Sequence, residues 1–236
     1  MTDADALREK TKITYDRLVE LHGPVPLKPR REPMHELIST MLSHRTTQAN
    51  EALAFQRMWD RFGSWEAIRD APLDELIEAI EPSNYPETKA PRIQEALRQI
   101  IAERGEPSID FLRDLPAGEG LAWLMKLPGV GIKTASLVLL FCFSKPVLPV
   151  DTHVHRVTRR LGLIDPKTTA ERAHVELEAI VPPDEYYPAH LNLIRHGREI
   201  CHARRPRCEI CPLAPHCDYF QGQLQAAKSS DKATIE

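Results

Sequence analysis

A lysine directly after a glycine-rich turn is the first candidate for chemistry in this chain. Gly129 and Gly131 lie in the stretch 127–135 (LPGVGIKTA) and permit the positive φ of a tight turn. Apolar periodicity on either side predicts a helix, a hairpin and a second, buried helix over about residues 120–143. Lys133 falls in the first turn of the second helix, where the dipole disfavours a cation, and a neutral lysine amine is a nucleophile. The exposed amides of this turn also suit a phosphate.

The charge around this lysine distinguishes a functional turn from an ordinary one. A turn of this kind is more often a simple connection between helices, with a solvated lysine beside it. Between Glu119 and Asp165, however, Asp151 is the single acidic residue, in a chain of net charge −3. We therefore expect a local surface for polyanions here, and a second one over Arg195–Arg207. The basic residues of the first stretch are Lys126, Lys133, Lys145, Arg156, Arg159 and Arg160.

Four of the five cysteines lie close together in the C-terminal part of the chain. Six, two and five residues separate the successive members of this quartet. Clustered cysteines in a cytosolic chain are more often metal ligands than disulfides, and zinc sites usually pair two short two-cysteine knuckles. The quartet has one such knuckle, which favours a single 4Fe-4S cluster, with zinc as the alternative. Cys142 lies in an apolar run and is predicted to be a buried, inert thiol. The quartet consists of Cys201, Cys208, Cys211 and Cys217.

Helical periodicity accounts for nearly every segment of the 236 residues, and convincing period-2 strands are absent, so an all-α fold is predicted. One helix is expected over Asp3–His22, another over Thr152–Leu161 with Asp151 as its N-cap, and a third over Glu171–Ile180. Residues 221–236 are polar and lack aromatic side chains, and we expect a disordered tail there. No apolar run is long enough to span a bilayer and no signal-peptide pattern opens the chain. These features predict a soluble cytoplasmic protein, nucleoid-associated if bacterial.

Three motifs occur here in the order typical of one family. The hairpin with Lys133 comes first, the stretch 149–153 (PVDTH) with Asp151 follows, and the cysteine quartet comes last. On these residues the chain resembles endonuclease III, of the helix-hairpin-helix DNA glycosylase superfamily, over Asp3 to Tyr219. The resemblance implies two helical lobes: a six-helix bundle domain over 27–145 and a 4Fe-4S cluster domain built from 1–26 and 146–220.

The resemblance implies a bifunctional DNA glycosylase/AP lyase of base excision repair that works as a monomer on double-stranded DNA. Lys133 would attack C1′ of a flipped nucleotide, displace the damaged base and form a Schiff base, whose β-elimination nicks the strand. Asp151 matches the aspartate that helps to activate this lysine and stabilises positive charge developing on the sugar. A plain helix cap is the alternative role for Asp151. Oxidised pyrimidines are the expected lesions, and abasic sites are a simpler substrate.

DNA contacts are implied for three parts of the chain. The cluster would have a structural role, folding a loop whose arginines contact the phosphate backbone. Gly129 and Gly131 would bring the hairpin backbone to the DNA. Arg45 stands where the family usually has a glutamine that fills the space left by the flipped nucleotide. The loop arginines are Arg204, Arg205 and Arg207, for each of which a solvated charge is the alternative.

A second departure from the family concerns the expected wedge. The loop Glu81–Thr88 is longer than usual and lacks the leucine that enters the other strand, which leaves Pro82 and Tyr85 as apolar candidates. Together with Arg45 this predicts base excision that is narrower or slower than the cleavage of abasic sites. Adenine-mismatch glycosylases usually have a serine at the position of Lys133 and carry a further C-terminal domain. Lys133 and the short C-terminus of this chain both argue against that activity. A monofunctional alkylated-base glycosylase and a non-catalytic DNA-binding iron–sulfur protein remain the alternatives.

Overall fold

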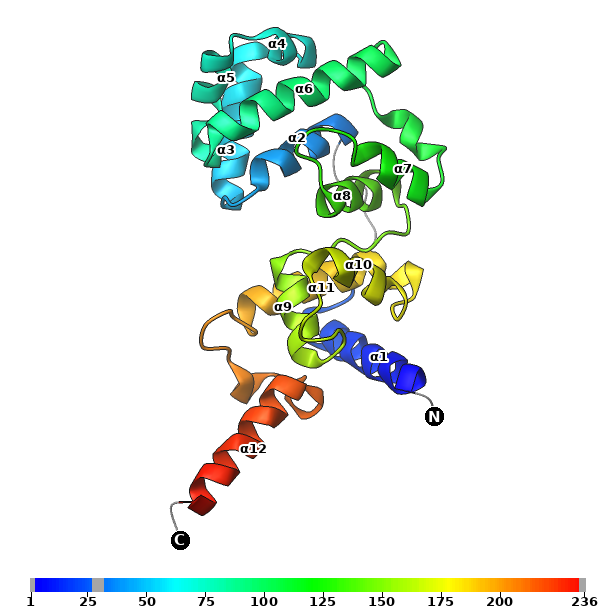
Figure 1. The fold of residues 1–236 in the computed structure, drawn as a ribbon, viewed down its shortest axis with the longest axis vertical. Helices are drawn as coiled ribbons and strands as arrows, with labels where there is room; N and C mark the ends of the chain where they lie inside the picture. Colours follow the sequence, from blue (N-terminus) through cyan, green and yellow to red (C-terminus); the bar gives the residue numbers. More distant parts are fainter. Residues whose placement is uncertain (1–2, 27–31, 234–236) are drawn as a thin grey trace. The chain divides into compact units, whose positions relative to one another are not determined.

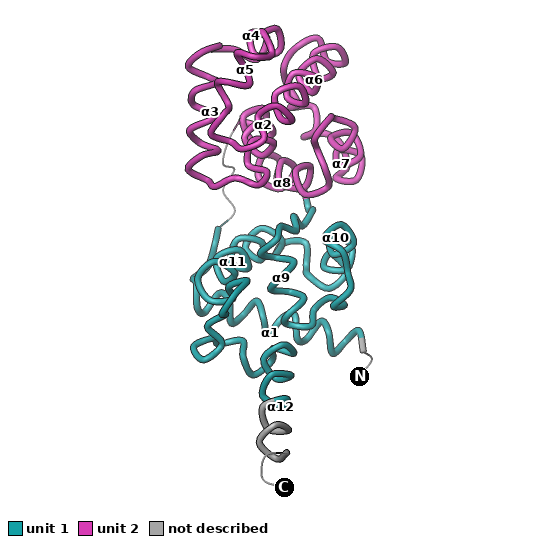
Figure 2. Tube along the Cα trace, turned by 60° about the vertical axis from the view of Figure 1, so that its left-hand side comes forward, with its two compact units in different colours: residues 1–27, 146–236 teal, residues 28–145 magenta. Residues whose placement is uncertain are grey.

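A computed structural model describes residues 3–26 and 32–233 of the chain. The chain divides into two compact units, shown in different colours in Figure 2. Unit 1 comprises residues 1–27 and 146–236, and unit 2 comprises residues 28–145. The sequence placed Leu27 in the bundle domain, whereas this division places it in unit 1; its structure lies outside the described residues.

All the regular elements of the described residues are helices, with no strand among them, so the predicted all-α class is confirmed (Figure 1). None of the helices in the described ranges is long and apolar enough to cross a membrane. Short 3-10 helices (η1–η5) join several of the α-helices.

Unit 2 is built around α8, whose side chains are buried on nearly every side. α8 packs against α2 and α7, and α6 packs against α4 and α5. The apolar side of α2, with Leu37, Ile38 and Leu42, is fully buried. Because α8 lies in this core, the turn that precedes it is attached to a well-packed helix. The elements are α2 (Pro33–Ser43), α3 (Gln48–Phe62), α4 (Trp65–Asp70), α5 (Leu73–Ala79), η1 (Glu81–Ser83), α6 (Pro86–Arg104), η2 (Asp110–Arg113), α7 (Ala117–Leu124) and α8 (Ile132–Phe143).

Unit 1 joins the N-terminal helix to the C-terminal part of the chain. α11 packs against both α1 and α9, while α10 and α12 pack against α9. The predicted ends of α1 and α9 agree with the structure, and α10 ends two residues earlier than predicted. The elements are α1 (Asp3–His22), α9 (Thr152–Leu161), α10 (Ala170–Glu178), η3 (Pro183–Glu185), α11 (Tyr186–Glu199), η4 (Cys208–Ile210), η5 (Ala214–His216) and α12 (Asp218–Ala233).

The prediction of a disordered tail over 221–236 is wrong for residues 221–233, which continue α12. Tertiary contacts anchor the beginning of this helix. The Arg160 guanidinium lies 4.7 Å from the centroid of the Tyr219 ring, and Gln221 Nε2 donates to the Ala214 carbonyl at 3.0 Å. A helix anchored at its first turn extends at little further cost, because nucleation is the expensive step. Residues 234–236 lie outside the described part of the chain.

Candidate active site and metal centre

The hairpin between α7 and α8 is a tight turn that depends on one glycine more than on the other. The amide of Val130 donates to the Leu127 carbonyl at 3.1 Å and closes the turn. Gly129 has φ of +82°, as predicted, and a Cβ there would lie 3.1 Å from the Arg92 side chain. Gly131 does not use the positive φ that glycine permits, since it has φ of −96° and ψ of 178°, an extended conformation with open space around it.

Lys133 lies half-buried in the first turn of α8, as the sequence predicted. Gly131 is the N-cap of this helix, and no side chain caps its first amides. Uncapped amides at the positive end of a helix dipole attract an anion such as a phosphate. The start of α8 therefore combines a primary amine with a group of anion-binding amides.

His44 is a site residue that the sequence did not single out. Its Nε2 atom lies 3.1 Å from Oγ1 of Thr134, in the first turn of α8. Burial, together with the positive charges of Lys133, Lys89 and Arg92, lowers the pKa of His44 to about 4. The imidazole next to the proposed nucleophile is therefore neutral at physiological pH. Its place directly before Arg45 is the one sequence signal that could have drawn attention to it.

Asp151 begins α9, and its predicted role as N-cap is confirmed. Its Oδ1 atom accepts from the amides of His153 and Val154, both at 2.8 Å. Both bonds use the same oxygen, so the cap leaves Oδ2 out of these two interactions. Nothing in these contacts tests the second role for Asp151, as a partner of the lysine. Lys133 belongs to unit 2 and Asp151 to unit 1.

Buried polar side chains fix the segment that leads into Asp151. Nδ1 of His174 lies 2.9 Å from the Leu148 carbonyl, and Nδ1 of His190 lies 2.8 Å from the Pro149 carbonyl. Glu178 accepts from the Leu148 amide at 2.8 Å. Burial lowers the pKa of His174 and raises that of Glu178. The segment is thus held on α10 and α11, which gives Asp151 a defined position within unit 1.

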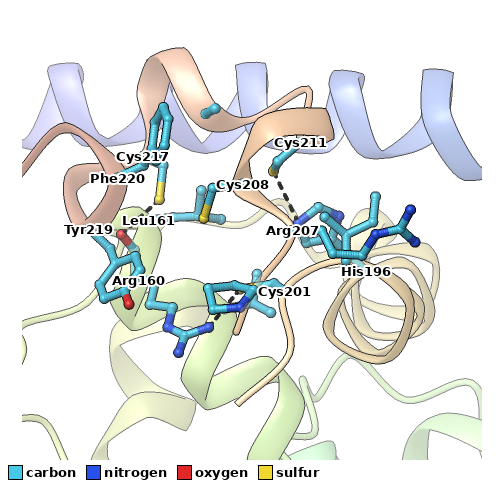
Figure 3. Close-up of a pocket in the computed structure, with 14 residues that line it drawn as sticks. Arg160, Leu161, His196, Cys201, Arg207, Cys208, Cys211, Cys217, Tyr219 and Phe220 are labelled. Carbon is cyan, nitrogen blue, oxygen red and sulfur yellow. Dashed lines mark hydrogen bonds between the residues drawn. The ribbon is translucent and has the colours of Figure 1, made fainter. Parts of the chain in front are cut away.

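The cysteine quartet surrounds a single cavity in unit 1 (Figure 3). The cavity has an empty volume of about 370 Å³, open solvent included. In the described part of the chain, no three side chains among His, Cys, Asp and Glu converge closely enough to hold one metal ion. Four thiols that line one cavity provide the four cysteine ligands that a 4Fe-4S cluster takes. The residues present therefore fit an iron–sulfur group.

Neighbouring polar groups contact three sulfurs of the quartet. Arg160 Nη1 donates to Sγ of Cys201 at 3.3 Å, and Nε2 of His196 lies 3.6 Å from Sγ of Cys211. Sγ of Cys217 lies 3.3 Å from the Arg160 carbonyl. Burial raises the pKa of Cys211 to about 11, so the thiolate that iron requires depends on the charge of the metal itself. Such outer groups orient the ligands and modify the cluster that they hold.

Arg160 also shapes the loop that begins at Cys201. Its guanidinium donates to the carbonyls of His202 at 2.7 Å and Ala203 at 3.0 Å. The amide of Arg207 donates to the Ile200 carbonyl at 3.0 Å and closes the loop. All three loop arginines are exposed: Arg204, Arg205 and Arg207.

Three cations of the acid-poor stretch contribute to the fold through hydrogen bonds within their own units. Lys145 donates to the Arg113 carbonyl at 2.7 Å. Arg156 donates to the Gly197 carbonyl at 2.8 Å, and Arg160 makes the loop contacts above. Carbonyl groups of their own unit thus bind these side chains. Composition alone did not show this, because the carbonyl partners lie more than 30 positions away in the sequence.

The predicted loop Glu81–Thr88 is largely helical, which corrects the sequence interpretation. η1 takes up Glu81–Ser83, and α6 begins at Pro86, so Asn84 and Tyr85 alone connect the two. Of the two predicted wedge residues, Pro82 is half-buried in η1, whereas Tyr85 is 57% exposed. The Arg45 guanidinium lies 6.0 Å from the centroid of the Tyr85 ring. The two departures from the family pattern are therefore neighbours in unit 2.

Cys142 is buried in α8, as predicted, with 7% of its surface exposed. Burial raises the pKa of its thiol to about 12. A thiol that stays protonated at neutral pH is inert, which agrees with the sequence interpretation.

Comparisons with known proteins agree with the motifs. The profile described as "HhH-GPD superfamily base excision DNA repair protein" matches residues 38–183, and that of the "iron-sulfur binding domain of endonuclease III" matches residues 201–217. Endonuclease III of Thermotoga maritima is 35% identical over 190 residues, which cover 80% of this chain and 84% of that protein. Endonuclease III of Rickettsia prowazekii is 34% identical over 212 residues, covering 87% and 94% of the two chains.

A solved structure shows the same fold. An endonuclease III in a non-covalent complex with DNA superposes with a TM-score of 0.79 at 28% identity, covering 92% of this chain and 98% of that one. These comparisons support DNA binding and a 4Fe-4S cluster as the cofactor. On the profile match and on the identity to both relatives, the chain belongs to the endonuclease III family of the HhH-GPD base excision DNA repair superfamily.

Proposed function

We propose that this base excision repair DNA glycosylase/AP lyase is bifunctional, acts as a monomer on duplex DNA, and removes oxidised pyrimidines with Lys133 as its nucleophile. The observation that carries the proposal is the position of Lys133 in the uncapped first turn of α8. His44, which is neutral at physiological pH, contacts Thr134 in the same turn of the helix. A primary amine in this turn is a group that can attack carbon and form a Schiff base.

The proposed reaction begins with the nucleotide flipped out of the duplex, because the sugar cannot be reached inside the stack. The Lys133 nitrogen forms a bond to C1′ while the bond from C1′ to the base breaks, and the base leaves with a proton. The bond from C1′ to the ring oxygen then breaks, the oxygen takes up a proton, and C1′ and the lysine nitrogen are left as a Schiff base. Loss of the proton on C2′ then expels the 3′ phosphate, which nicks the strand. Asp151 helps to activate the lysine and stabilises the positive charge that develops on the sugar.

The quartet Cys201, Cys208, Cys211 and Cys217 is proposed to ligate the cluster. When bound, the cluster supplies a rigid cross-link between the ends of the 201–217 segment. The chain's own residues would supply the DNA contact, since Arg160 holds the loop backbone and the three loop arginines are exposed. These cations would position the phosphate backbone without reading its sequence.

Borohydride trapping tests the proposal directly. The protein is incubated with duplexes that carry a thymine glycol, an alkylated purine or an abasic site, and borohydride reduces any Schiff base to a stable cross-link. We expect cross-links with the thymine glycol and abasic duplexes, and none with the variant Lys133→Ala. Lys126→Ala, which removes an exposed lysine near the same turn, is the matched control and keeps the cross-link.

Other outcomes would support the alternative functions. Release of the alkylated purine without a cross-link would indicate a monofunctional glycosylase. Binding without release or cross-link would indicate a non-catalytic protein.

A mass in solution of 26.8 kDa would support the monomer.

A further inference from the structure

Two turns of unit 2 adopt left-handed backbone conformations at residues other than glycine. φ is 53° at Arg45 and 54° at both Asn84 and Tyr85. Such conformations cost free energy and persist where the surrounding structure holds them. Within the described residues, two buried hydroxyl oxygens of the same turns, Thr46 Oγ1 and Ser83 Oγ, have no hydrogen-bond partner. The local conformation therefore does not sustain itself, and other groups must hold it.

Lys89 and Asn84 provide that restraint. Lys89 is only 7% exposed, and its Nζ donates to the carbonyls of Leu42, at 2.7 Å, and Ser83. Leu42 lies in the last turn of α2, just before the Arg45 turn, and Ser83 ends η1, just before Asn84. Burial lowers the pKa of Lys89 to about 8, so at neutral pH the amine is mostly charged and both bonds are of the strong, charge-assisted kind.

A direct bond joins the two turns themselves. Nδ2 of Asn84 donates to the carbonyl of Arg45 at 2.9 Å. The Arg45 guanidinium and the Tyr85 ring, both exposed, then lie beside each other at 6.0 Å. An exposed aromatic ring next to a guanidinium is the combination on which unpaired nucleic-acid bases stack.

Arginine adds a chemical preference to this pair. Its guanidinium has five donors and no acceptor. Guanine offers two adjacent acceptors, O6 and N7, whereas adenine offers the N7 acceptor beside an N6 donor. Of the two purines, guanine is thus the better partner for Arg45. Because the turns are already restrained, little side-chain and backbone entropy is lost when the contact forms.

We propose that Lys89 and Asn84 are positioning residues that hold the two turns as one preformed reader of the base opposite the flipped nucleotide, in which Tyr85 stacks on that base and Arg45 selects guanine over adenine. The inference rests on the proposed function, since a flipped pyrimidine leaves a purine as the unpaired partner.

Equilibrium binding measures this preference without any chemical step. Dissociation constants of the full-length protein are measured for duplexes in which a tetrahydrofuran abasic analogue faces guanine or adenine. For the unaltered protein we expect tighter binding opposite guanine, on the order of tenfold, the range of one bidentate base contact. Arg45→Gln should bring the ratio close to one. Tyr85→Ala should weaken binding opposite both bases and keep the ratio.

The positioning role is tested by the residues that do not read the base. Asn84→Ala and Lys89→Met should each lower the guanine-to-adenine ratio, although Arg45 and Tyr85 remain. Arg98→Gln, which removes an exposed charge from α6, is the control and should keep both constants. Thermal unfolding shows whether each variant is folded. If Lys89→Met does not fold, Asn84→Ala alone tests the positioning role, because Asn84 is exposed.

Two results would overturn the proposal. A ratio near one in the unaltered protein would show that Arg45 does not select the base. A wild-type ratio in Asn84→Ala would show that the restraint does not position the reader. Because the analogue has no glycosidic bond to break, either failure is distinct from a failure of the proposed function, which borohydride trapping reports.

Discussion

Nε2 of His44 lies 3.1 Å from Oγ1 of Thr134, and this contact connects the turn that carries Arg45 to the helix that carries Lys133. Thr134 is 1% exposed, so the junction lies inside unit 2. A protonated imidazole would be poorly solvated there and would face Lys133, Lys89 and Arg92, and its pKa of about 4 reflects both effects. The contact between the turn that carries Arg45 and α8 therefore depends on a neutral histidine.

Acid should weaken the protein through this histidine. Between pH 6.5 and about 4 the unfolded histidine binds a proton that the folded one rejects, so the unfolded state binds more protons. The contribution of His44 to the free energy of unfolding should therefore be fully present above pH 6.5 and be lost as the pH drops toward 4. Thermal unfolding at pH 7.5 and pH 5 measures the fall. In His44→Gln, which keeps a polar side chain but cannot take up the proton, the fall should be smaller; an equal fall would assign the acid sensitivity to other groups.

The helices that the sequence predicted best are those whose ends are set by neighbouring residues. α1 ends before Gly23, which has φ of 84°, and α9 begins at a side chain that caps its own helix. Cap and stop signals of this kind are local, so the sequence contains them. The predicted tail failed for the opposite reason, because α12 is anchored by the contact between Tyr219 and Arg160, 59 positions apart.

The site residues that belong to a sequence motif could be predicted, whereas those whose role depends on contacts with distant carbonyls could not. Lys133 follows from the glycine turn, the cysteines follow from their spacing, and Asp151 follows from the resemblance to the family motif. Lys89 does not, because its role depends on carbonyls at positions 42 and 83, which no periodicity relates to it. A lysine on α6 looks like a solvated residue until its burial is known.

The two roles of Asp151 can be separated by substitution. Asparagine caps a helix about as well as aspartate but has no charge, so Asp151→Asn should keep the melting temperature and lower base excision by roughly 10²–10⁴-fold. Asp151→Ala should lose the cap as well, at about 0.5–2 kcal/mol of stability. Single-turnover excision and thermal unfolding measure the two effects. Full activity in Asp151→Asn would leave the aspartate as a cap only.

The two hairpin glycines should respond differently to a methyl group. Gly129→Ala forces an L side chain into φ of +82° and against Arg92, which should cost roughly 1–2 kcal/mol of stability. Gly131→Ala meets open space in an extended conformation, so its stability should change by less than about 0.5 kcal/mol. If a phosphate approaches the start of α8, Gly131→Ala should nevertheless weaken DNA binding. Denaturant unfolding and DNA titration distinguish these effects, and equal destabilisation by both substitutions would contradict the turn geometry.

The metal content should depend on the quartet and not on the fifth cysteine. The purified protein should be yellow-brown and contain about four iron and four sulfide ions per chain. Cys142→Ala should keep the iron, because that thiol is buried in α8, whereas Cys208→Ala should lose most of it. Iron and sulfide assays with the visible absorbance measure this. One zinc per colourless chain would establish zinc as the metal in place of the cluster.

The loop arginines should account for part of the salt dependence of DNA binding. With a net charge of −3 the protein depends on local cations to hold a polyanion, and each phosphate contact adds roughly one unit to the slope of log affinity against log salt. Replacing Arg204, Arg205 and Arg207 together by glutamine should therefore flatten the slope by up to about three units, for damaged and undamaged duplexes alike. The matched control replaces three exposed cations of α1, which already pair with acidic neighbours: Arg8, Lys12 and Arg17. Both triple variants change the net charge equally, so a slope that flattens to the same extent in both would reflect overall charge, whereas flattening in the loop variant alone would identify the cysteine loop as a DNA contact.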